Sequence, residues 1–383
     1  MTLRVGSYGR AMPPGDDEIA AEPPDESSVD RVEALLGDES DEQPKKSRRL
    51  KVLIVALVAL LAVIVIGVGS VVALVDYGVD HHLTRAALLP TGGAPGQRAV
   101  ARNPVAGNAQ NILLIGSDSR AGSVTDVQGG GGNSDVIQLV HISRGDHKIS
   151  VVDFPRDLYV AIPGFPMNKI NWAYARGGAP LLVATMQNLL GVHIDHVAQI
   201  DFTGFADLTN DLGGVDVYVR QGFSEGKTNS DVTNPPGFGS WTTGWHHMDG
   251  AQALGFVRER HQLTEGDIDR GRDEQEWLHA VIKKLMKPSV LLNPFKLASA
   301  TNDIAKYATV DKGMSVGYLD GMAVHLAGLN GSDITYYTAP WSGFATNADG
   351  DVDVVNMPQM KLLGRALNRD EMAGYTNGEN DIH

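Results

Sequence analysis

The chain has 383 residues, of which 43% are hydrophobic, and its formal net charge is −14. It contains no cysteine, which excludes disulfides, thiolate metal sites and a cysteine nucleophile. The length is sufficient for one large domain or two ordinary ones with a substantial core. Residues 76–383 hold 24 basic and 34 acidic residues, a balance that argues against a general nucleic-acid-binding surface.

The N-terminal part of the chain divides into three segments of different composition. Residues 1–44 hold twelve acidic residues against three arginines, which predicts a disordered acidic tail. Residues 45–51 carry five basic side chains, and residues 52–75 carry no charge. As a helix, 24 uncharged residues would measure about 36 Å, enough to cross a bilayer core of about 30 Å. The positive-inside rule then places the N-terminus in the cytoplasm and the rest outside the plasma membrane, behind a single transmembrane helix.

The remainder of the sequence predicts one extracytoplasmic domain. Residues 76–107 are rich in Pro and Gly and indicate a linker, the domain is expected over 108–370, and 371–383 form a C-terminal tail. Strands are expected at 112–115, 136–142, 149–154, 196–201, 215–219 and 334–339. Helices are expected at 180–190, 202–212, 249–256, 272–286, 294–307, 315–329 and 357–367. This alternation predicts an α/β fold in which helices flank a core sheet.

Charged residues follow the ends of the first three predicted strands. Asp118 and Arg120 come after the first strand in NILLIGSDSR, Asp135 opens the second, and Arg156 and Asp157 follow the third. Other charged residues stand in later loops and helix ends, namely Lys169, Arg258, Arg260, Arg270 and Arg272. Because ligand sites in α/β folds gather where strands end, we expect these side chains to meet.

The types of residue in this set favour phosphate chemistry. Carboxylates without Cys or His partners suit Mg²⁺, which takes one or two carboxylates and fills its other positions with water or phosphate oxygens. Arginine presents a planar fork that matches phosphate oxygens. A Mg²⁺-pyrophosphate site for phosphoryl transfer is therefore one hypothesis. Each motif also has a structural explanation: Asp118 as a turn residue, PRD as a strand-ending turn with an ion pair, and VRERH as a solvated helix end.

Taken in order, seven motifs resemble one known family. They are NILLIGSDSR, NSDVIQLVHIS, VVDFPRDLYV, KINWAYARGG, HVAQIDFTGFADLTNDLGGVDVYV, MDGAQALGFVRERH and GDIDRGR. Together they resemble the LytR-CpsA-Psr family of cell-wall phosphotransferases, over about residues 108–345 and onward to about 370. The resemblance implies an α/β/α sandwich with a central mixed sheet and a cavity for a lipid chain. It also implies an enzyme that moves a glycopolymer from a polyprenyl-pyrophosphate carrier to peptidoglycan, with Mg²⁺ and, in several members, pyrophosphatase activity.

The resemblance also implies roles for individual residues. Asp118 and Asp135 match the family's metal-linked aspartates, and Asp157 is expected to act as a base. The residues expected to hold the pyrophosphate are Arg120, Arg156, Lys169, Arg258, Arg260, Arg270, Arg272 and Gln275. The four expected at the catalytic centre are Asp118, Asp135, Arg156 and Asp157.

The sequence departs from the family pattern directly after GDIDRGR. The family usually continues with Arg-Gln-Gln, whereas this chain reads Asp273-Glu274-Gln275. A carboxylate beside a pyrophosphate is repulsive unless a cation intervenes. Either the site is altered, with Arg272 as compensation, or the two acids turn away at a helix start. This departure motivates a second hypothesis, a non-catalytic protein that binds the lipid carrier or the wall polymer. A third, a membrane-bound transcriptional regulator, fits poorly because the cytoplasmic tail is acidic and lacks a helix-turn-helix pattern.

Overall fold

The computed structural model describes residues 80–91, 100–117, 132–145, 148–224, 240–260, 262–291, 293, 299, 302, 304–326, 329, 331–380 and 382. The predicted acidic tail, basic segment and membrane helix at 52–75 lie outside these residues, as do Asp118, Arg120 and most of the predicted helix at 294–307. Within the described ranges, no helix combines the length and the apolar character needed to cross a membrane.

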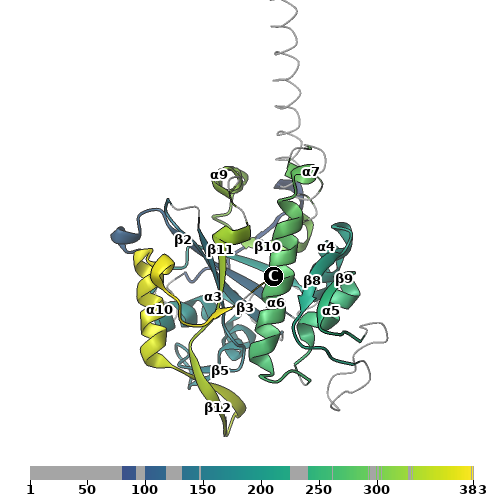
Figure 1. Cartoon of the computed structure of the whole chain (residues 1–383). Helices are drawn as coiled ribbons and strands as arrows, with labels where there is room; N and C mark the ends of the chain where they lie inside the picture. Colours follow the sequence, from purple (N-terminus) through teal and green to yellow (C-terminus); the bar gives the residue numbers. More distant parts are fainter. Residues whose placement is uncertain are drawn as a thin grey trace, which may run out of the picture. The chain divides into compact units, whose positions relative to one another are not determined.

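An eight-stranded mixed sheet forms the centre of the fold, in the order β1-β10-β7-β2-β3-β4-β11-β14 (Figure 1). Its strands are β1 (Thr84–Ala86), β2 (Gln110–Ser117), β3 (Ser134–Ile142), β4 (Ile149–Asp153), β7 (His196–Asp201), β10 (Ala308–Asp311), β11 (Ile334–Thr338) and β14 (Glu379–Asn380). Strand β2 runs antiparallel to β3 and parallel to β7, and β4 runs antiparallel to β3 and parallel to β11. The predicted α/β class with a central mixed sheet is confirmed.

Both faces of the sheet are covered because its central strands are apolar on both sides. In β2, Leu113 and Ile115 pack with α3 (Ile170–Leu190) and α10 (Met357–Arg369). The alternate residues Ile112 and Leu114 face the opposite side and pack with α9 (Val316–Leu326). Helix α6 (Asp267–Leu285) covers β4 and β11 on that second face. A strand buried on both faces reads as a continuous apolar run, as ILLI does here.

A satellite layer lies beside α6. It contains α4 (Phe202–Asp211), α5 (Gly250–Arg258) and the antiparallel pair β8 (Val215–Val219) and β9 (Gly244–Met248), which share an apolar cluster with α6. Figure 1 shows these elements grouped next to α6. The short α7 (Pro288–Leu291) follows α6, and three 3₁₀ turns lie at Pro104–Ala106, Gly331–Asp333 and Met372–Gly374.

A second sheet has four strands in the order β12-β13-β5-β6. They are β5 (Leu158–Val160), β6 (Asn168–Lys169), β12 (Trp341–Asn347) and β13 (Gly350–Val355). Strand β5 begins directly after the PRD motif, and β6 ends at Lys169, so this sheet connects two predicted site residues. None of its strands is predicted by the sequence reasoning above: β5 and β6 are three and two residues long, and the pairing of β13 with β5 joins parts of the chain that are far apart.

Two predicted helices differ from the structure in where they begin. Helix α3 starts at Ile170, ten residues before the predicted start at Pro180, and it bends at Gly178, whose φ of 61° is non-helical. Pro180 therefore opens the second part of a kinked helix. Helix α6 starts at Asp267, five residues earlier than predicted, so Asp273 and Glu274 lie in its second turn. The expectation that these acids stand at a helix start is wrong.

Candidate functional site

Predicted site residues meet where β3 starts, where β4 ends and where α6 begins. Asp135 in β3 forms an ion pair with the guanidinium of Arg156, which follows β4. The backbone N–H of Arg156 donates to Asp267 Oδ2 at 3.0 Å, and its Nε lies 3.5 Å from Asp267 Oδ1. Asp267 is the first residue of α6, so its carboxylate ties the PRD turn to the start of this helix.

Arg270 links Asp267 to the backbone of Asp135. Its Nη2 lies 2.7 Å from Asp267 Oδ1 and donates to the carbonyl oxygen of Asp135 at 3.0 Å. Its Nε lies 3.3 Å from Glu274 Oε1. Burial opposes the charged form, but the carboxylates of Asp267 and Glu274 outweigh it and raise the pKa of Arg270 above its ordinary value. Arg270 is thus a charged, buried member that holds the site together.

A second group of predicted residues lies along β5 and β6. Lys169 Nζ is 3.1 Å from Asp157 Oδ1, and Arg260 Nη1 is 3.6 Å from Asp157 Oδ2. Burial lowers the pKa of Arg260, and the nearby charge of Arg156 adds to this effect. The two groups are therefore electrostatically coupled. Both carboxylate oxygens of Asp157 therefore face cations.

The site cations differ in how far a ligand can reach them. The side chains of Arg156, Lys169 and Arg260 are 19%, 23% and 34% exposed, whereas that of Arg270 is 5% exposed. The first three can exchange a carboxylate partner for a ligand oxygen. Arg270 is instead enclosed by protein carboxylates, which indicates a positioning role in place of the predicted direct contact with pyrophosphate.

Two buried carboxyl groups in this region were missed by the sequence reasoning. Asp153 is the last residue of β4, and Asp353 lies in β13, where its backbone N–H donates to the carbonyl of Asp157 at 3.0 Å. Burial, followed by repulsion from Asp267, raises the pKa of both to about 7. Within the described residues, Oδ2 of Asp353 has no hydrogen-bond partner. Asp353 stands in the run DVDVV, whose alternation is typical of a strand but was not used in the prediction above and gives no sign of its distant neighbours.

Asp273 and Glu274 point into different surroundings. Glu274 pairs with Arg270 inside the site, and burial raises its pKa well above the ordinary value. Burial also raises the pKa of Asp273, but its charged neighbours are Asp269, Arg220, Glu276 and Arg272. Of the two replacements, only Glu274 therefore pairs with Arg270 in the group that holds Asp135 and Arg156.

Three other predicted residues are engaged elsewhere. Arg258 is exposed and stacks on the ring of Phe202, 4.7 Å from its centroid. Arg272 Nη1 contacts Glu265 and Asp269 at 2.8 and 2.7 Å. Gln275 is fully buried; it donates to the carbonyl of Tyr337 and accepts from Asn380. These partners account for Arg272 and Gln275 as structural residues, in contrast to their predicted contacts with pyrophosphate.

The structure describes β2 as far as Ser117, the residue before the predicted site residue Asp118. Ser117, the last described residue before Asp118, pairs with Ser134 on one side and Asp201 on the other. Asp118 and Arg120 themselves lie outside the described residues. Their predicted roles stay predictions.

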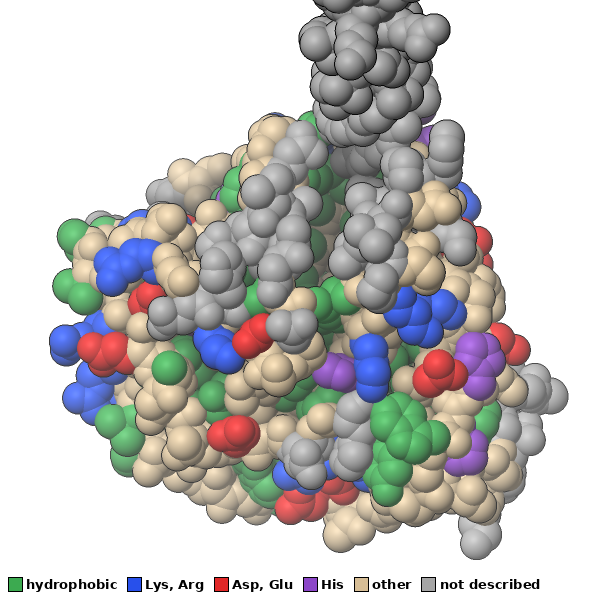
Figure 2. Space-filling view, turned by 45° about the horizontal axis from the view of Figure 1, so that its top comes forward, with side chains coloured by type: hydrophobic (Ala, Val, Ile, Leu, Met, Phe, Trp, Pro, Cys, Tyr) green, Lys and Arg blue, Asp and Glu red, His purple; other side chains and the backbone are tan. Residues whose placement is uncertain are grey.

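The ion pairs described above form one ionic cluster, made up of Asp135, Arg156, Asp157, Lys169, Arg260, Asp267, Arg270 and Glu274. An apolar cavity of about 190 Å³ adjoins this ionic cluster. It lies between the sheet and α4, α5 and α6, and its lining includes Ile115, Ile200, Phe205, Val257 and Trp277. Glu274 also lines it, so the carboxylate that pairs with Arg270 marks the boundary between cavity and ionic cluster. On the face drawn in Figure 2, the described Lys and Arg side chains are interspersed with acids and form no continuous basic patch.

The site thus combines accessible cations with a nearby apolar cavity. Comparison with known proteins then identifies the family: the chain belongs to the LytR_cpsA_psr family, which matches residues 92–362. The family resemblance in the sequence is thereby confirmed.

Curated relatives come from several bacteria. The probable cell wall biosynthesis protein LcpB of Corynebacterium glutamicum is 32% identical over 252 residues, covering 64% of this chain and 57% of the relative. The polyisoprenyl-teichoic acid–peptidoglycan teichoic acid transferase TagT of Bacillus subtilis is 34% identical over 174 residues, covering 45% and 52%. The regulatory protein MsrR of Staphylococcus aureus is 29% identical over 252 residues, covering 64% and 70%. The chain thus spans little more than half the length of the first two.

Solved structures share the fold. A LytR-Csp2A-Psr enzyme from Actinomyces oris matches with a TM-score of 0.57 at 19% identity, covering 75% of this chain and 96% of that one. TagT bound to LI-WTA matches with a TM-score of 0.54 at 23% identity, covering 75% and 99%. At these identities the likeness concerns the fold alone.

Proposed function

We propose that this protein is a phosphotransferase that moves a glycopolymer from a polyprenyl-pyrophosphate carrier to peptidoglycan during cell-wall assembly, and that it can also hydrolyse the pyrophosphate. The observation that carries the proposal is the junction at Glu274, where the ionic cluster meets the apolar cavity. A prenyl chain would enter the cavity, and its pyrophosphate would lie at Arg156, Lys169 and Arg260. The name of TagT, a polyisoprenyl-teichoic acid–peptidoglycan teichoic acid transferase, and that of LcpB, a probable cell wall biosynthesis protein, support the proposal.

The transfer requires one bond to form and one to break at phosphorus. An acceptor hydroxyl would attack the phosphorus nearer the polymer, the bridging P–O bond would break, and polyprenyl phosphate would leave. Arg156 and Arg260 would stabilise the charge that grows on the leaving phosphate, as positioned cations do in other phosphoryl transfers. Asp157, whose two oxygens lie 3.1 Å from Lys169 Nζ and 3.6 Å from Arg260 Nη1, would accept the hydroxyl proton.

Magnesium fits the donor chemistry of the site. The described residues contain no group of three or more side chains able to hold a metal ion, so a fully protein-coordinated cage is not formed by them. Mg²⁺ needs only one or two carboxylates when substrate oxygens complete its shell. Asp135 would supply one and Asp118 the second, and the ion would neutralise pyrophosphate charge. Arg156, now paired with Asp135, would then be released toward the substrate.

The proposed reaction fits the predicted placement of the chain. A polyprenyl carrier lies in a membrane and peptidoglycan lies outside it, so an enzyme that joins them gains from an anchor. The uncharged segment 52–75 and the basic residues before it motivate a single-pass helix with a cytoplasmic N-terminus. Protease added to intact cells stripped of their wall should cleave the C-terminal domain; protection of that domain until the cells are lysed would contradict the proposal.

Glu274 favours the second candidate, a non-catalytic lipid-carrier or polymer binder, because a carboxylate replaces a neutral amide beside the phosphates. The two candidates differ in phosphate release. We expect the 383-residue chain in lipid nanodiscs to release phosphate from geranyl pyrophosphate with Mg²⁺. Arg156→Ala should lose most of the rate, while Arg365→Ala, exposed on α10, serves as the control. Retained binding of geranyl pyrophosphate without hydrolysis would support the binder.

A further inference from the structure

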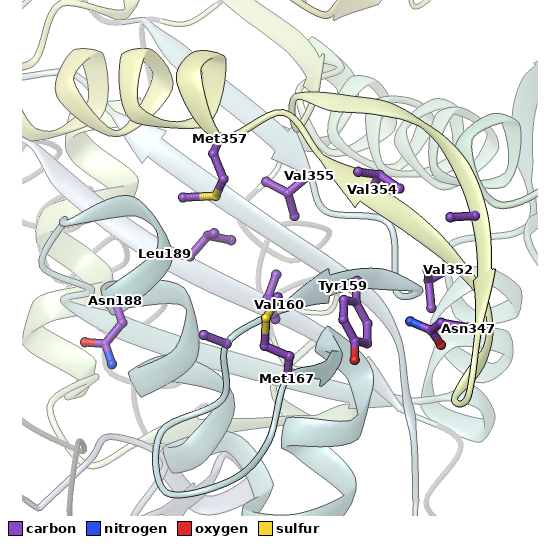
Figure 3. Close-up of a pocket in the computed structure, with 12 residues that line it drawn as sticks. Tyr159, Val160, Met167, Asn188, Leu189, Asn347, Val352, Val354, Val355 and Met357 are labelled. Atoms are coloured by element: carbon purple, nitrogen blue, oxygen red, sulfur yellow. The ribbon is translucent and has the colours of Figure 1, made fainter.

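A second and larger cavity lies apart from the apolar one. It has a volume of about 530 Å³, within the range typical of ligand pockets. Strands β5, β12 and β13, the loop before β6, the end of α3 and the start of α10 form its walls (Figure 3). Neither the sequence motifs nor the proposed transfer chemistry accounts for it.

The lining of this second cavity is uncharged but not wholly apolar. Figure 3 shows Val160, Leu189, Val355 and Met357 around a common space. Three groups able to form hydrogen bonds stand at its margin: Asn188 on one side, Tyr159 and Asn347 on the other. An ionic ligand would find no counter-charge here. A neutral ligand with apolar faces and polar edges would satisfy both kinds of surface.

The carboxamides at the margin have capacity for a ligand. In the described part of the chain, no hydrogen bond engages the side chain of Asn188. Asn347 Oδ1 accepts from the backbone N–H of Asp349 at 2.8 Å, which leaves its amide N–H groups available. Both residues are exposed, so a ligand that enters the cavity from solvent can contact them.

The rim of the second cavity carries several exposed apolar residues. Met167, Val354 and Met357 line it with side chains 49%, 39% and 42% exposed. Phe165 and Phe344, each one or two residues from a lining residue, are 45% and 60% exposed. Clustered exposed apolar residues around a cavity indicate a surface that a ligand covers.

The second cavity adjoins the ionic cluster through one strand pair. Tyr159, which lines the cavity, lies directly opposite Lys169, whose Nζ contacts Asp157 at 3.1 Å. Directly paired residues in antiparallel strands have Cβ atoms about 5 Å apart. A chain-like ligand in the cavity would therefore extend to the ionic cluster within one or two of its units.

Hydrogen bonds fix the strands β5 and β6, which lie between the second cavity and the ionic cluster, to the β12–β13 hairpin. Asp349, in the turn between β12 and β13, accepts hydrogen bonds from Tyr159 Oη at 3.0 Å and Asn168 Nδ2 at 3.3 Å. These bonds hold the β12–β13 hairpin against β5 and β6. The cavity is thus preorganised rather than formed by the ligand.

We propose that the second cavity is a subsite for the acceptor glycan, which binds an uncharged amino-sugar unit next to the one that reacts. Pyranose rings present apolar C–H faces, which suit Val160, Val355 and Met357, and their hydroxyl and acetamido groups suit Asn188 and Asn347. The subsite rests on the proposed transferase function, since it supplies that reaction with a positioned acceptor. A charged lipid headgroup or a free phosphate does not fit its uncharged lining.

The test uses the 383-residue chain in nanodiscs and an N-acetylglucosamine tetrasaccharide as the probe. Val354→Lys places a charge in the cavity at a position that is already exposed, so the fold should tolerate it. Leu362→Lys, 41% exposed on α10 and outside the cavity, is the matched control. We expect Val354→Lys to weaken tetrasaccharide binding and transfer to a glycan acceptor at least ten-fold. Hydrolysis of geranyl pyrophosphate, which needs no glycan, should stay within two-fold of the unmodified protein.

Each outcome decides the proposal. Equal tetrasaccharide affinity in Val354→Lys and Leu362→Lys overturns it, as does the absence of tetrasaccharide binding by the unmodified protein. Loss of geranyl pyrophosphate hydrolysis in Val354→Lys alone would also overturn it, because the cavity would then serve the donor. If the unmodified protein neither hydrolyses nor transfers, the transferase function fails. Tetrasaccharide binding that depends on Val354 would in that case still support a glycan site.

Discussion

Replacing Asp153 by Asn should make the protein more stable at neutral and alkaline pH. Asp153 is 2% exposed, and it lies opposite Gln138 in the paired strand β3. Burial and the charge of Asp267 raise its pKa from 3.8 to about 7. Asparagine resembles the protonated acid in shape, but it cannot ionise.

The sign of the effect follows from the direction of the shift. Because the pKa of Asp153 is higher in the folded than in the unfolded chain, the folded chain binds the proton more tightly. The resulting stabilisation is fully present below pH 3.8 and is lost as the pH rises through about 7. A shift of roughly three units corresponds to about 4 kcal/mol, at about 1.4 kcal/mol per unit. The variant should therefore match the parent near pH 4 and exceed it by up to about 4 kcal/mol at pH 8.

Urea denaturation of residues 77–383, followed by circular dichroism at pH 4.5, 6 and 8, measures this difference. Asp351→Asn, at an exposed position in β13, is the matched control and should show no comparable change with pH. Equal stability of Asp153→Asn and the parent at pH 8 would refute the reasoning. The reasoning would also be refuted if the stability of Asp153→Asn relative to the parent fell between pH 4.5 and pH 8.

Three further substitutions probe the ionic cluster and the packing of α6 beside it. Arg156→Ala should lower hydrolysis of geranyl pyrophosphate by roughly 10²- to 10³-fold with little change in Tm, because an accessible charge-stabilising group is lost; a rate within three-fold of the parent would contradict its role. Asp273→Arg should leave the hydrolysis rate within two-fold but lower Tm, because position 273 is buried outside the cluster; a faster enzyme would show that the acid impairs the site. Gly271→Ala should destabilise the folded protein by about 1–3 kcal/mol, since the new Cβ would lie 2.1 Å from Asp153 Oδ2. The control Gly317→Ala places its Cβ in open space and should not destabilise the protein. Equal urea midpoints for the two variants would argue against close packing of α6 on β4.

The five strands β2, β3, β4, β7 and β11 of the central sheet could be predicted from their apolar runs; β7 has the predicted bounds, and β2 extends the predicted run by two residues at each end. The other three strands of this sheet were not predicted: β10 is short, and β1 and β14 lie in the segments predicted as linker and C-terminal tail. The four-stranded sheet could not be predicted, because β5 and β6 are three and two residues long and β13 pairs with β5 across nearly two hundred positions. Short strands are specified by tertiary pairing more than by local pattern.

The candidate site was predictable where a motif fixes the backbone. Asp135, Arg156 and Arg270 converge as their positions at strand and helix ends indicate. Burial could not be predicted in the same way, since a sequence does not say which arginine faces solvent. Arg270 is enclosed and Arg156 is accessible, although both belong to motifs of the same family. Asp353 was missed because its partners come from distant parts of the chain.

The central claim is best tested by transfer itself. The measurement combines the 383-residue chain in nanodiscs with a radiolabelled glycopolymer on polyprenyl pyrophosphate, Mg²⁺ and isolated peptidoglycan, and follows label that becomes covalently attached to the peptidoglycan. The account predicts attachment that requires Mg²⁺ and falls at least a hundred-fold in Arg156→Ala, with release of polyprenyl phosphate. Unlabelled peptidoglycan, with the polymer still bound to an intact carrier, would contradict it.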